Sequence, residues 1–173
     1  MQAPRGGSHI DEQWTLALDR QLCFALYAAS RAVTALYRPL LDALGLTYPQ
    51  YLVMLVLWEQ ESVLVKELGA ALQLDYGTLT PLLKRLETHG LLRRERRADD
   101  ERSVLITLTE QGTALRDRAE AVPGLMAKGT GLEPAEFAQL RAALRQLTAN
   151  VTKAAHANAA SPPAELADQV ARR

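Results

Sequence analysis

Residues 75–109 read DYGTLTPLLKRLETHGLLRRERRADDERSVLITLT. The first half has leucines at helical spacing, whereas the second half alternates apolar and polar residues on either side of a charged segment. Asp75 precedes the leucines and is a typical helix N-cap. We therefore predict a helix over 76–89, followed by two β-strands over 91–97 and 104–109 that are joined by a polar hairpin loop.

The rest of the chain is mostly helical by pattern. Thr15 or Asp19 could cap a long first helix that ends near Ala43. Further helices are predicted over 48–59, capped by Thr47, and over 65–72, with an extended piece over 62–64 between them. A fifth helix begins at Thr109 and is interrupted or bent at Pro123–Gly124, and a last helix runs from Pro134 to Asn150 or beyond. This order is typical of a mainly α fold, a winged helix-turn-helix with a small antiparallel β wing and long N- and C-terminal helices.

The predicted helix over 76–89 has two different faces. Its leucines fall on one side and most of its polar residues fall on the other. A helix that enters the major groove needs this split, because its apolar back packs on a scaffold while its polar front meets bases and phosphates. The candidate DNA contacts on this helix are Tyr76, Gly77, Thr78, Thr80, Pro81, Lys84 and Arg85.

Three of these candidates have specific expected roles. Gly77 would let the backbone approach a phosphate closely, and the hydroxyls of Thr78 and Thr80 could donate to phosphates or touch base edges. Pro81 lies beyond the first helical turn, where a proline removes a hydrogen bond, and this broken local rule indicates a functional position.

Positive charge is concentrated around the same helix. Residues 84–97 hold six basic and two acidic residues, a net charge of +4, whereas residues 59–83 hold one basic and four acidic residues. At the hairpin tip, Arg102 could enter a minor groove while Asp100 holds its guanidinium. A solvated basic helix is the plainer interpretation of the charge alone, but charge, helix and wing together favour DNA binding.

Composition limits the class of protein. Lys plus Arg number 20 and Asp plus Glu number 20, and this zero net charge argues against a histone-like or purely architectural DNA binder. Cys23 is the one cysteine, which excludes an intramolecular disulfide and a multi-cysteine zinc site, and we expect neither a metal nor a cofactor. No apolar run reaches the roughly 18–20 residues that span a bilayer, so we expect a cytoplasmic protein without a membrane partner.

Five segments resemble the MarR family of transcription regulators: VKELGAAL over 65–72, LTPLLKRLE over 79–87, GLLRR over 90–94, DDERS over 99–103 and LITLT over 105–109. The resemblance extends over about residues 16–151. It implies a homodimer, with the first and last helices at the interface, that binds a pseudo-palindromic operator in double-stranded DNA, usually as a repressor. Tyr76 is a departure, because members of the family often have serine there.

Composition at the two ends of the chain and the resemblance between them together set the expected domain organisation. We predict a disordered tail over 1–13, one MarR-type winged-helix domain over 14–158 and a C-terminal tail over 159–173. Within the domain, the DNA-binding lobe covers about 62–109, and the dimerisation helices cover 15–45 and 110–158.

The segment LDRQLCFALYAASR over 18–31 resembles more narrowly the organic hydroperoxide-sensing branch of this family, the OhrR type, which has a reactive cysteine early in the first helix. If Asp19 is the cap, Cys23 lies near the N-terminus of that helix, where the helix dipole favours a thiolate. A thiolate attacks a peroxide and becomes a sulfenic acid. An inert buried cysteine is the plainer interpretation of a lone thiol.

A polar stripe continues from this cysteine along the first helix: Cys23, Tyr27, Ser30, Thr34 and Tyr37 recur at helical spacing. Cys23 and Tyr37 lie about 21 Å apart along a helix and cannot touch within one copy, but they could meet between two antiparallel copies that cross near Ser30. We infer a sensor built across the dimer. The resemblance implies that tyrosines matching Tyr37 and Tyr48 hydrogen-bond the sulfur of the partner subunit and that Tyr27 lines the pocket.

The resemblance implies a one-cysteine member of this branch, because no second cysteine is present. The sulfenic acid should be over-oxidised or capped by a low-molecular-weight thiol as a mixed disulfide on Cys23, and the added bulk should release the DNA. Two other functions stay open. One is a MarR-type repressor that is regulated by a reversibly bound phenolic ligand, with Cys23 incidental. The other is a thiol peroxidase. We do not expect the protein to be an enzyme, because that function would leave the basic helix and the wing unexplained.

Overall fold

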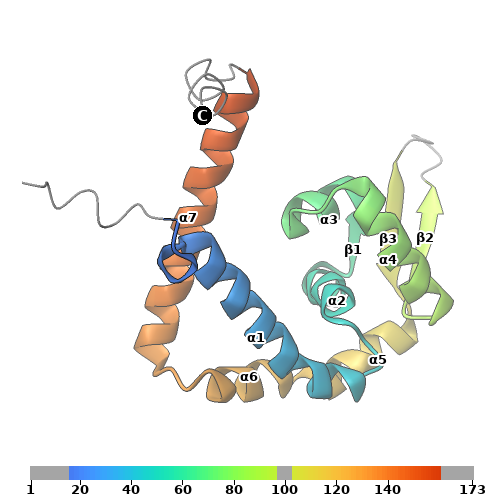
Figure 1. The fold of residues 1–173 in the computed structure, drawn as a ribbon. Coiled ribbons are helices and arrows are strands. Elements are labelled where there is room, and N and C mark those ends of the chain that lie inside the picture. Colours follow the sequence, from blue (N-terminus) through green and yellow to red (C-terminus); the bar gives the residue numbers. More distant parts are fainter. Residues whose placement is uncertain (1–15, 97–102, 161–173) are drawn as a thin grey trace, which may run out of the picture. The chain divides into compact units, whose positions relative to one another are not determined.

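The computed structural model describes residues 16–96 and 103–160 (Figure 1). The chain divides into two compact units, Met1–Gly129 and Thr130–Arg173. Within the described ranges, no helix is both long enough and apolar enough to cross a membrane.

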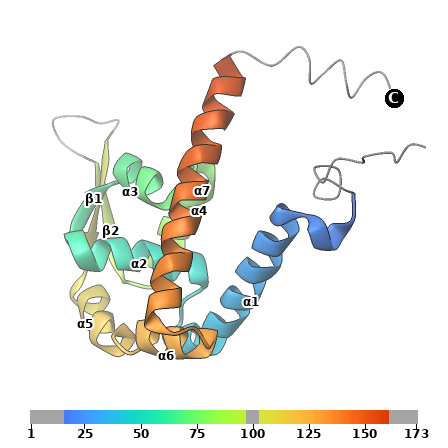
Figure 2. The same cartoon turned by 90° about the vertical axis from the view of Figure 1, so that its left-hand side faces the viewer.

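The first unit combines helices with a small sheet. Its elements in chain order are a 3-10 turn η1 (Leu18–Arg20), α1 (Leu22–Asp42), α2 (Tyr48–Gln60), β1 (Ser62–Leu64), α3 (Val65–Leu72), α4 (Tyr76–Thr88), β2 (Leu92–Arg96), β3 (Val104–Leu108), α5 (Glu110–Ala119) and α6 (Val122–Thr130). Figure 2 shows α5 and α6 following one another along one edge of this unit, below α2 and the sheet. The second unit contains α7 (Pro134–Ala160).

The sheet has the strand order β1-β3-β2, and both pairings are antiparallel. Ile106 in the central strand lies opposite Val63 of β1 and Arg94 of β2, and its side chain is fully buried. The predicted small antiparallel wing is therefore confirmed. Its tip, including Asp100 and Arg102, lies outside the described residues, as do the predicted tail over 1–13 and residues 161–173.

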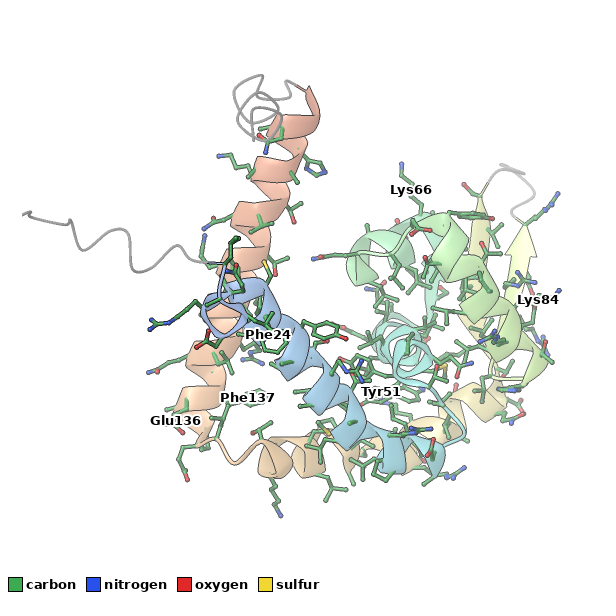
Figure 3. The ribbon with its side chains drawn as sticks, viewed as in Figure 1. Phe24, Tyr51, Lys66, Lys84, Glu136 and Phe137 are labelled. Atoms are coloured by element: carbon green, nitrogen blue, oxygen red, sulfur yellow. The ribbon has the colours of Figure 1, made fainter. Side chains whose placement is uncertain are left out.

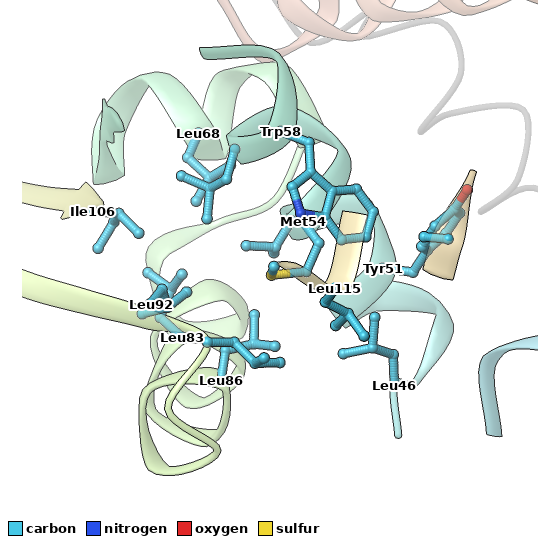
Figure 4. Packing of buried hydrophobic residues seen from close by; sticks show 14 of the residues in the cluster. Leu46, Tyr51, Met54, Trp58, Leu68, Leu83, Leu86, Leu92, Ile106 and Leu115 are labelled. Carbon is cyan, nitrogen blue, oxygen red and sulfur yellow. The ribbon is translucent and has the colours of Figure 1, made fainter. Parts of the chain in front are cut away.

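The core of the first unit surrounds α2. Figure 4 shows Met54 and Trp58 of α2 among leucines of α3, α4 and β2. Each fully buried leucine of this kind contributes about 1.5–3 kcal/mol through the hydrophobic effect. The indole Nε1 of Trp58 donates a buried hydrogen bond to the Gly112 backbone oxygen at 2.9 Å, which fastens α2 to α5. This core fixes the orientation of α4, the helix predicted to read DNA.

The helix boundaries follow cap chemistry at most positions. Thr47 forms a capping box with Gln50, and the side chains of Asp75 and Thr109 accept hydrogen bonds from the third residues of α4 and α5. Gly90 has a φ of 71°, which permits the left-handed turn between α4 and β2. The predictions for these boundaries are confirmed to within two residues.

The start of the first helix was predicted wrongly. Neither Thr15 nor Asp19 caps α1, because Leu18–Arg20 forms a separate 3-10 turn and the chain is extended at Gln21 before α1 begins. Gln21 is the N-cap residue and makes no side-chain capping bond. At the other end of the chain, α7 continues to Ala160, two residues into the predicted C-terminal tail.

Candidate functional site: a recognition helix and a lone thiol

The two faces of α4 differ as predicted. Leu79, Leu83 and Leu86 are buried and Leu82 is half-buried, whereas Lys84 and Arg85 are exposed. Figure 3 shows the Lys84 side chain pointing away from the core on α4. Tyr76, the first residue of α4, is 66% exposed. This helix therefore presents a polar and basic surface to solvent, as a major-groove helix requires.

The N-terminal turn of α4 is held by Asp75. The backbone N–H of Thr78 donates to Oδ1 of Asp75 at 2.8 Å, and the Thr78 hydroxyl donates to Oδ2 at 2.9 Å. These two hydrogen bonds, the backbone one first, hold the pKa of the Asp75 carboxyl below its ordinary value. A Cβ on Gly77 would lie 3.1 Å from Oδ1, so the glycine also leaves room for the cap.

The threonine hydroxyls of α4 are already used as donors within the chain. Thr78 donates to Asp75, and Thr80 Oγ1 donates to the Tyr76 backbone oxygen at 2.7 Å. In this arrangement each hydroxyl offers a DNA ligand only acceptor lone pairs. Donation to a phosphate, which the sequence suggested for both, requires these internal bonds to break.

One basic residue counted in the sequence is neutralised in the structure. Arg94 of β2 forms an ion pair with Glu87 of α4, with Nη2 and Oε2 2.7 Å apart. The exposed basic residues of α4 and β2 among the described residues are Lys84, Arg85, Arg93 and Arg96. The net charge of +4 over 84–97 already includes Glu87, so the ion pair leaves this net charge unchanged. Among the described residues of this segment, the exposed positive groups lie on α4 and β2.

Cys23 is exposed at the second position of α1. Its place near the helix N-terminus agrees with the prediction, although Gln21 and not Asp19 precedes the helix. One turn further along α1, the Tyr27 hydroxyl accepts a hydrogen bond from Arg31 Nη1 at 3.0 Å, and the Arg31 guanidinium carbon lies 5.6 Å from the centroid of the Tyr27 ring. Tyr27 is thus tied to an arginine on its own helix.

Tyr37 and Tyr48 meet where α1 packs on α2. Their ring centroids lie 4.8 Å apart, and the Tyr51 ring lies 5.8 Å from that of Tyr37. The pKa of Tyr37 is raised mainly by burial and secondly by the neighbouring Tyr48. The pKa of Tyr51 is also raised, mainly by burial and then by Tyr37 and Tyr48. The Tyr37 phenol therefore stays protonated and remains a hydrogen-bond donor at neutral pH.

The sequence pattern does not single out Tyr51 for this cluster. It lies in the apolar run of α2, a pattern that by itself indicates only a core position, and it is 2% exposed. The detectable signal was its spacing: Tyr48 and Tyr51 are three residues apart and so fall on the same side of α2.

Cys23 is not brought to the tyrosine cluster within one chain. Both Cys23 and Tyr37 lie on the continuous helix Leu22–Asp42, about 21 Å apart along its axis. The described chain thus supplies a thiol at the start of α1 and, separately, a phenol cluster where the later part of α1 packs on α2.

Comparisons with known proteins agree with this architecture. The family model for the transcriptional regulator SarA/Rot matches residues 35–118. The organic hydroperoxide resistance transcriptional regulator of Bacillus subtilis (strain 168) is 51% identical over 132 residues, which cover 76% of this chain and 90% of that protein. The chain belongs to the MarR family of transcriptional regulators. Within the family, it is of the organic hydroperoxide regulator type.

Solved structures of the relative AbfR resemble this MarR-family chain over most of its length. AbfR of Staphylococcus epidermidis has a TM-score of 0.69 at 36% identity, covering 84% of this chain and 99% of AbfR. The structure of reduced AbfR bound to DNA has a TM-score of 0.67 at 36% identity, covering 79% of this chain and 93% of AbfR. The structure of overoxidised AbfR bound to DNA has a TM-score of 0.64 at 38% identity, covering 78% of this chain and 94% of AbfR.

Proposed function

We propose that this protein is a transcriptional repressor that senses organic hydroperoxides by oxidation of Cys23 and then releases its operator DNA. The observation that carries the proposal is the exposed single thiol near the N-terminus of α1, in a chain whose helix α4 presents an exposed basic face. The organic hydroperoxide resistance regulator of Bacillus subtilis, which is 51% identical in sequence, supports the link to organic hydroperoxides.

The DNA-binding half of the proposal assigns α4 to the major groove. Lys84 and Arg85 neutralise phosphates, and the exposed Tyr76 reaches the bases or the backbone from the first turn of the helix. Gly77 and Thr78 in the first turn, and Thr80 and Pro81 in the second, form the remaining surface of this end of α4. At the wing tip, Arg102 enters the adjacent minor groove while Asp100 holds its guanidinium. The DNA-bound structures of AbfR support this assignment.

A homodimer accounts for apolar side chains that the single chain leaves in solvent. On α1, Leu22, Phe24, Val33 and Leu36 are exposed, and on α7, Phe137, Leu140, Leu144 and Val151 are exposed. Such apolar helix faces are typical of subunit interfaces. A two-fold dimer places two copies of α4 on successive major grooves and therefore binds a pseudo-palindromic operator.

The dimer also completes the sensor. Two α1 helices that cross antiparallel near Ser30 bring the Cys23 sulfur of one subunit to Tyr37 and Tyr48 of the other, while Tyr27 lines the space between them. Because the Tyr37 phenol stays protonated, it can donate a hydrogen bond to a thiolate and stabilise it.

The proposed chemistry has two steps. The thiolate sulfur attacks the terminal oxygen of the hydroperoxide, the O–O bond breaks, and the alkoxide leaves as an alcohol after taking a proton, so that Cys23 becomes a sulfenic acid. A low-molecular-weight thiol then forms a bond to the sulfur and displaces the oxygen as water, which leaves a mixed disulfide. The bulk of this group at the interface changes the spacing of the two α4 helices and releases the DNA.

Operator binding by the wild type and by Cys23→Ser tests the proposal. Each is measured after treatment with buffer, with stoichiometric organic hydroperoxide, and with hydroperoxide plus a small thiol. We expect only the wild type to lose affinity, and the loss to be largest with the thiol present. If both proteins stay bound or both dissociate, Cys23 is not the sensor.

One observation favours the alternative of a reversibly bound phenolic ligand. A cavity of about 580 Å³ lies between α2, α5 and the start of α6, lined by Tyr51, Leu55, Trp58 and Pro123 together with charged residues. Its size and aromatic lining suit a small aromatic molecule. Under this alternative a phenolic compound dissociates both the wild type and Cys23→Ser from DNA, and hydroperoxide dissociates neither.

A further inference from the structure

A second cavity, of about 500 Å³, lies between the middle of α1 and the start of α2. Its lining includes the side chains of Arg31 and Arg38, with Asp42 as its one acidic residue among those described, and Tyr48. Two guanidinium groups against one carboxylate give the lining a net positive charge. A cavity of this volume holds a small organic molecule.

We propose that Arg31 and Arg38 bind a carboxylate carried by the molecule that reacts at Cys23 of the partner subunit. The inference rests on the proposed sensor function and adds to it the chemical class of the reactant. The reactant is an organic molecule with an anionic group at a distance from its reactive end.

The two arginines differ in how they are held. Arg31 donates to the Tyr27 hydroxyl and lies over the Tyr27 ring, so its guanidinium is oriented while its other N–H groups stay available. Arg38 has no hydrogen bond or ion pair within residues 16–96 and 103–160, although it is only one helical turn from Asp42. Arginine N–H groups match the geometry of a carboxylate and can bind both of its oxygens.

The cavity adjoins the proposed site of oxidation. Tyr48 lines the cavity and also packs against Tyr37, with 4.8 Å between the ring centroids. In the antiparallel dimer that crosses near Ser30, Cys23 of the partner subunit faces Tyr37. A molecule whose carboxylate lies on the arginines therefore directs its other end past Tyr48 toward that sulfur.

The carboxylate can belong to either of the two reactants. In the first step it is carried by the hydroperoxide, which oxidises the thiolate to a sulfenic acid and leaves as the alcohol. In the second step it is carried by the thiol, which forms the mixed disulfide and releases water. Whichever reactant carries the carboxylate, it binds to the same two arginines.

The test compares matched charged and neutral reactants on the full-length protein. The first arm measures the rate constant for loss of the Cys23 thiol with an alkyl hydroperoxide that bears a terminal carboxylate and with its methyl ester. The second arm generates the sulfenic acid with the ester and measures its capture by 3-mercaptopropionate and by the methyl ester of that thiol. The readout in each arm is the ratio of the carboxylate rate to the ester rate.

The variants are Arg38→Gln, which removes the charge, Arg38→Lys, which keeps it, and Lys153→Gln on α7 as a control outside the cavity. In the wild type we expect a ratio of about five to ten in at least one arm, falling as salt concentration rises. Arg38→Gln brings this ratio close to one, Arg38→Lys keeps part of it, and Lys153→Gln leaves it unchanged. The arm that shows the preference identifies which reactant carries the carboxylate.

A wild-type ratio near one in both arms overturns the inference, and so does a ratio that Arg38→Gln leaves unchanged. In either case, rapid oxidation of Cys23 leaves the proposed function standing. If neither hydroperoxide oxidises Cys23, the proposed function fails and the inference fails with it. Operator binding by the reduced variants, expected to match that of the wild type, shows that they are folded.

Discussion

Glu87 of α4 binds both the backbone and the side chain of Arg94 on β2. The Arg94 backbone N–H donates to Oε1 of Glu87 at 3.0 Å, and its guanidinium Nε donates to Oε2 at 2.7 Å. The carboxylate thus spans the turn between the recognition helix and the first strand of the wing. It fixes the angle between the two elements that are expected to contact DNA together.

Replacing Glu87 should therefore loosen the joint between helix and wing. We expect Glu87→Ala to lower the free energy of unfolding by about 1 kcal/mol, a modest value because both side chains are about one-third exposed. Glu95→Ala, at an exposed position of the same strand, is the matched control and should change it by less than about 0.5 kcal/mol. Urea unfolding of the two variants measures the difference, and equal effects would contradict the structural role of Glu87.

The basic face of α4 should control affinity for DNA of any sequence. Lys84→Ala and Arg85→Ala each remove one exposed positive charge from that face. We expect each variant to bind operator and unrelated DNA more weakly, and to reduce the slope of log K against log salt by about 1. Lys128→Ala on α6 should leave both quantities unchanged. An undiminished salt slope for Lys84→Ala would place α4 away from the phosphates.

The local chemistry of helix ends made most of this fold predictable. Thr47, Asp75 and Gly90 mark boundaries through their own side chain or backbone freedom, and the structure places the boundaries there. Asp19 was wrongly predicted as a cap, because it lies inside the short 3-10 turn that precedes α1. A residue that suits an N-cap can equally sit inside a short 3-10 turn, and sequence alone does not decide between the two.

Interactions between segments were harder to foresee. Glu87 and Arg94 lie seven residues apart on two different elements, and only the structure shows that they form an ion pair. Likewise, the apolar run of α2 hid Tyr51, which the packing of α1 on α2 places beside Tyr37. Both features depend on how two elements meet, and a pattern within one element carries no information on that.

Gly112 should tolerate no side chain. A Cβ at this position would overlap the backbone oxygen of Leu91, at the place where α5 passes the start of β2. We expect Gly112→Ala to lower the free energy of unfolding by about 3 kcal/mol. Gly124→Ala is the control, because a Cβ there meets no atom within 4 Å, and it should stabilise α6 by about 0.5 kcal/mol. Thermal unfolding distinguishes the two, and a Gly112→Ala variant as stable as the wild type would contradict the predicted overlap.

The cap at Asp75 should give stability a specific dependence on pH. The pKa of its carboxyl is lowered in the folded chain by the donors of Thr78, so the stabilisation is complete above the ordinary aspartate pKa and disappears as the pH falls through the lowered value. The wild type should be more stable than Asp75→Asn at neutral pH, and the gap should close in acid. Asp117→Asn, inside α5, is measured alongside as the control substitution. A gap that stays constant down to acidic pH would exclude the carboxylate as its cause.

The tyrosine cluster should control how fast Cys23 is oxidised. Tyr37→Phe and Tyr48→Phe each remove a phenol that is proposed to donate to the thiolate of the partner subunit, and each should slow oxidation by organic hydroperoxide on the order of tenfold. Tyr51→Phe is a matched control, because its ring belongs to the same cluster but is almost fully buried behind Tyr37. Stopped-flow measurement of thiol loss compares the three variants. Equal slowing in all three would mean that the cluster acts through packing of α1 on α2, whereas slowing confined to Tyr37→Phe and Tyr48→Phe requires hydrogen bonding to the sulfur across the dimer.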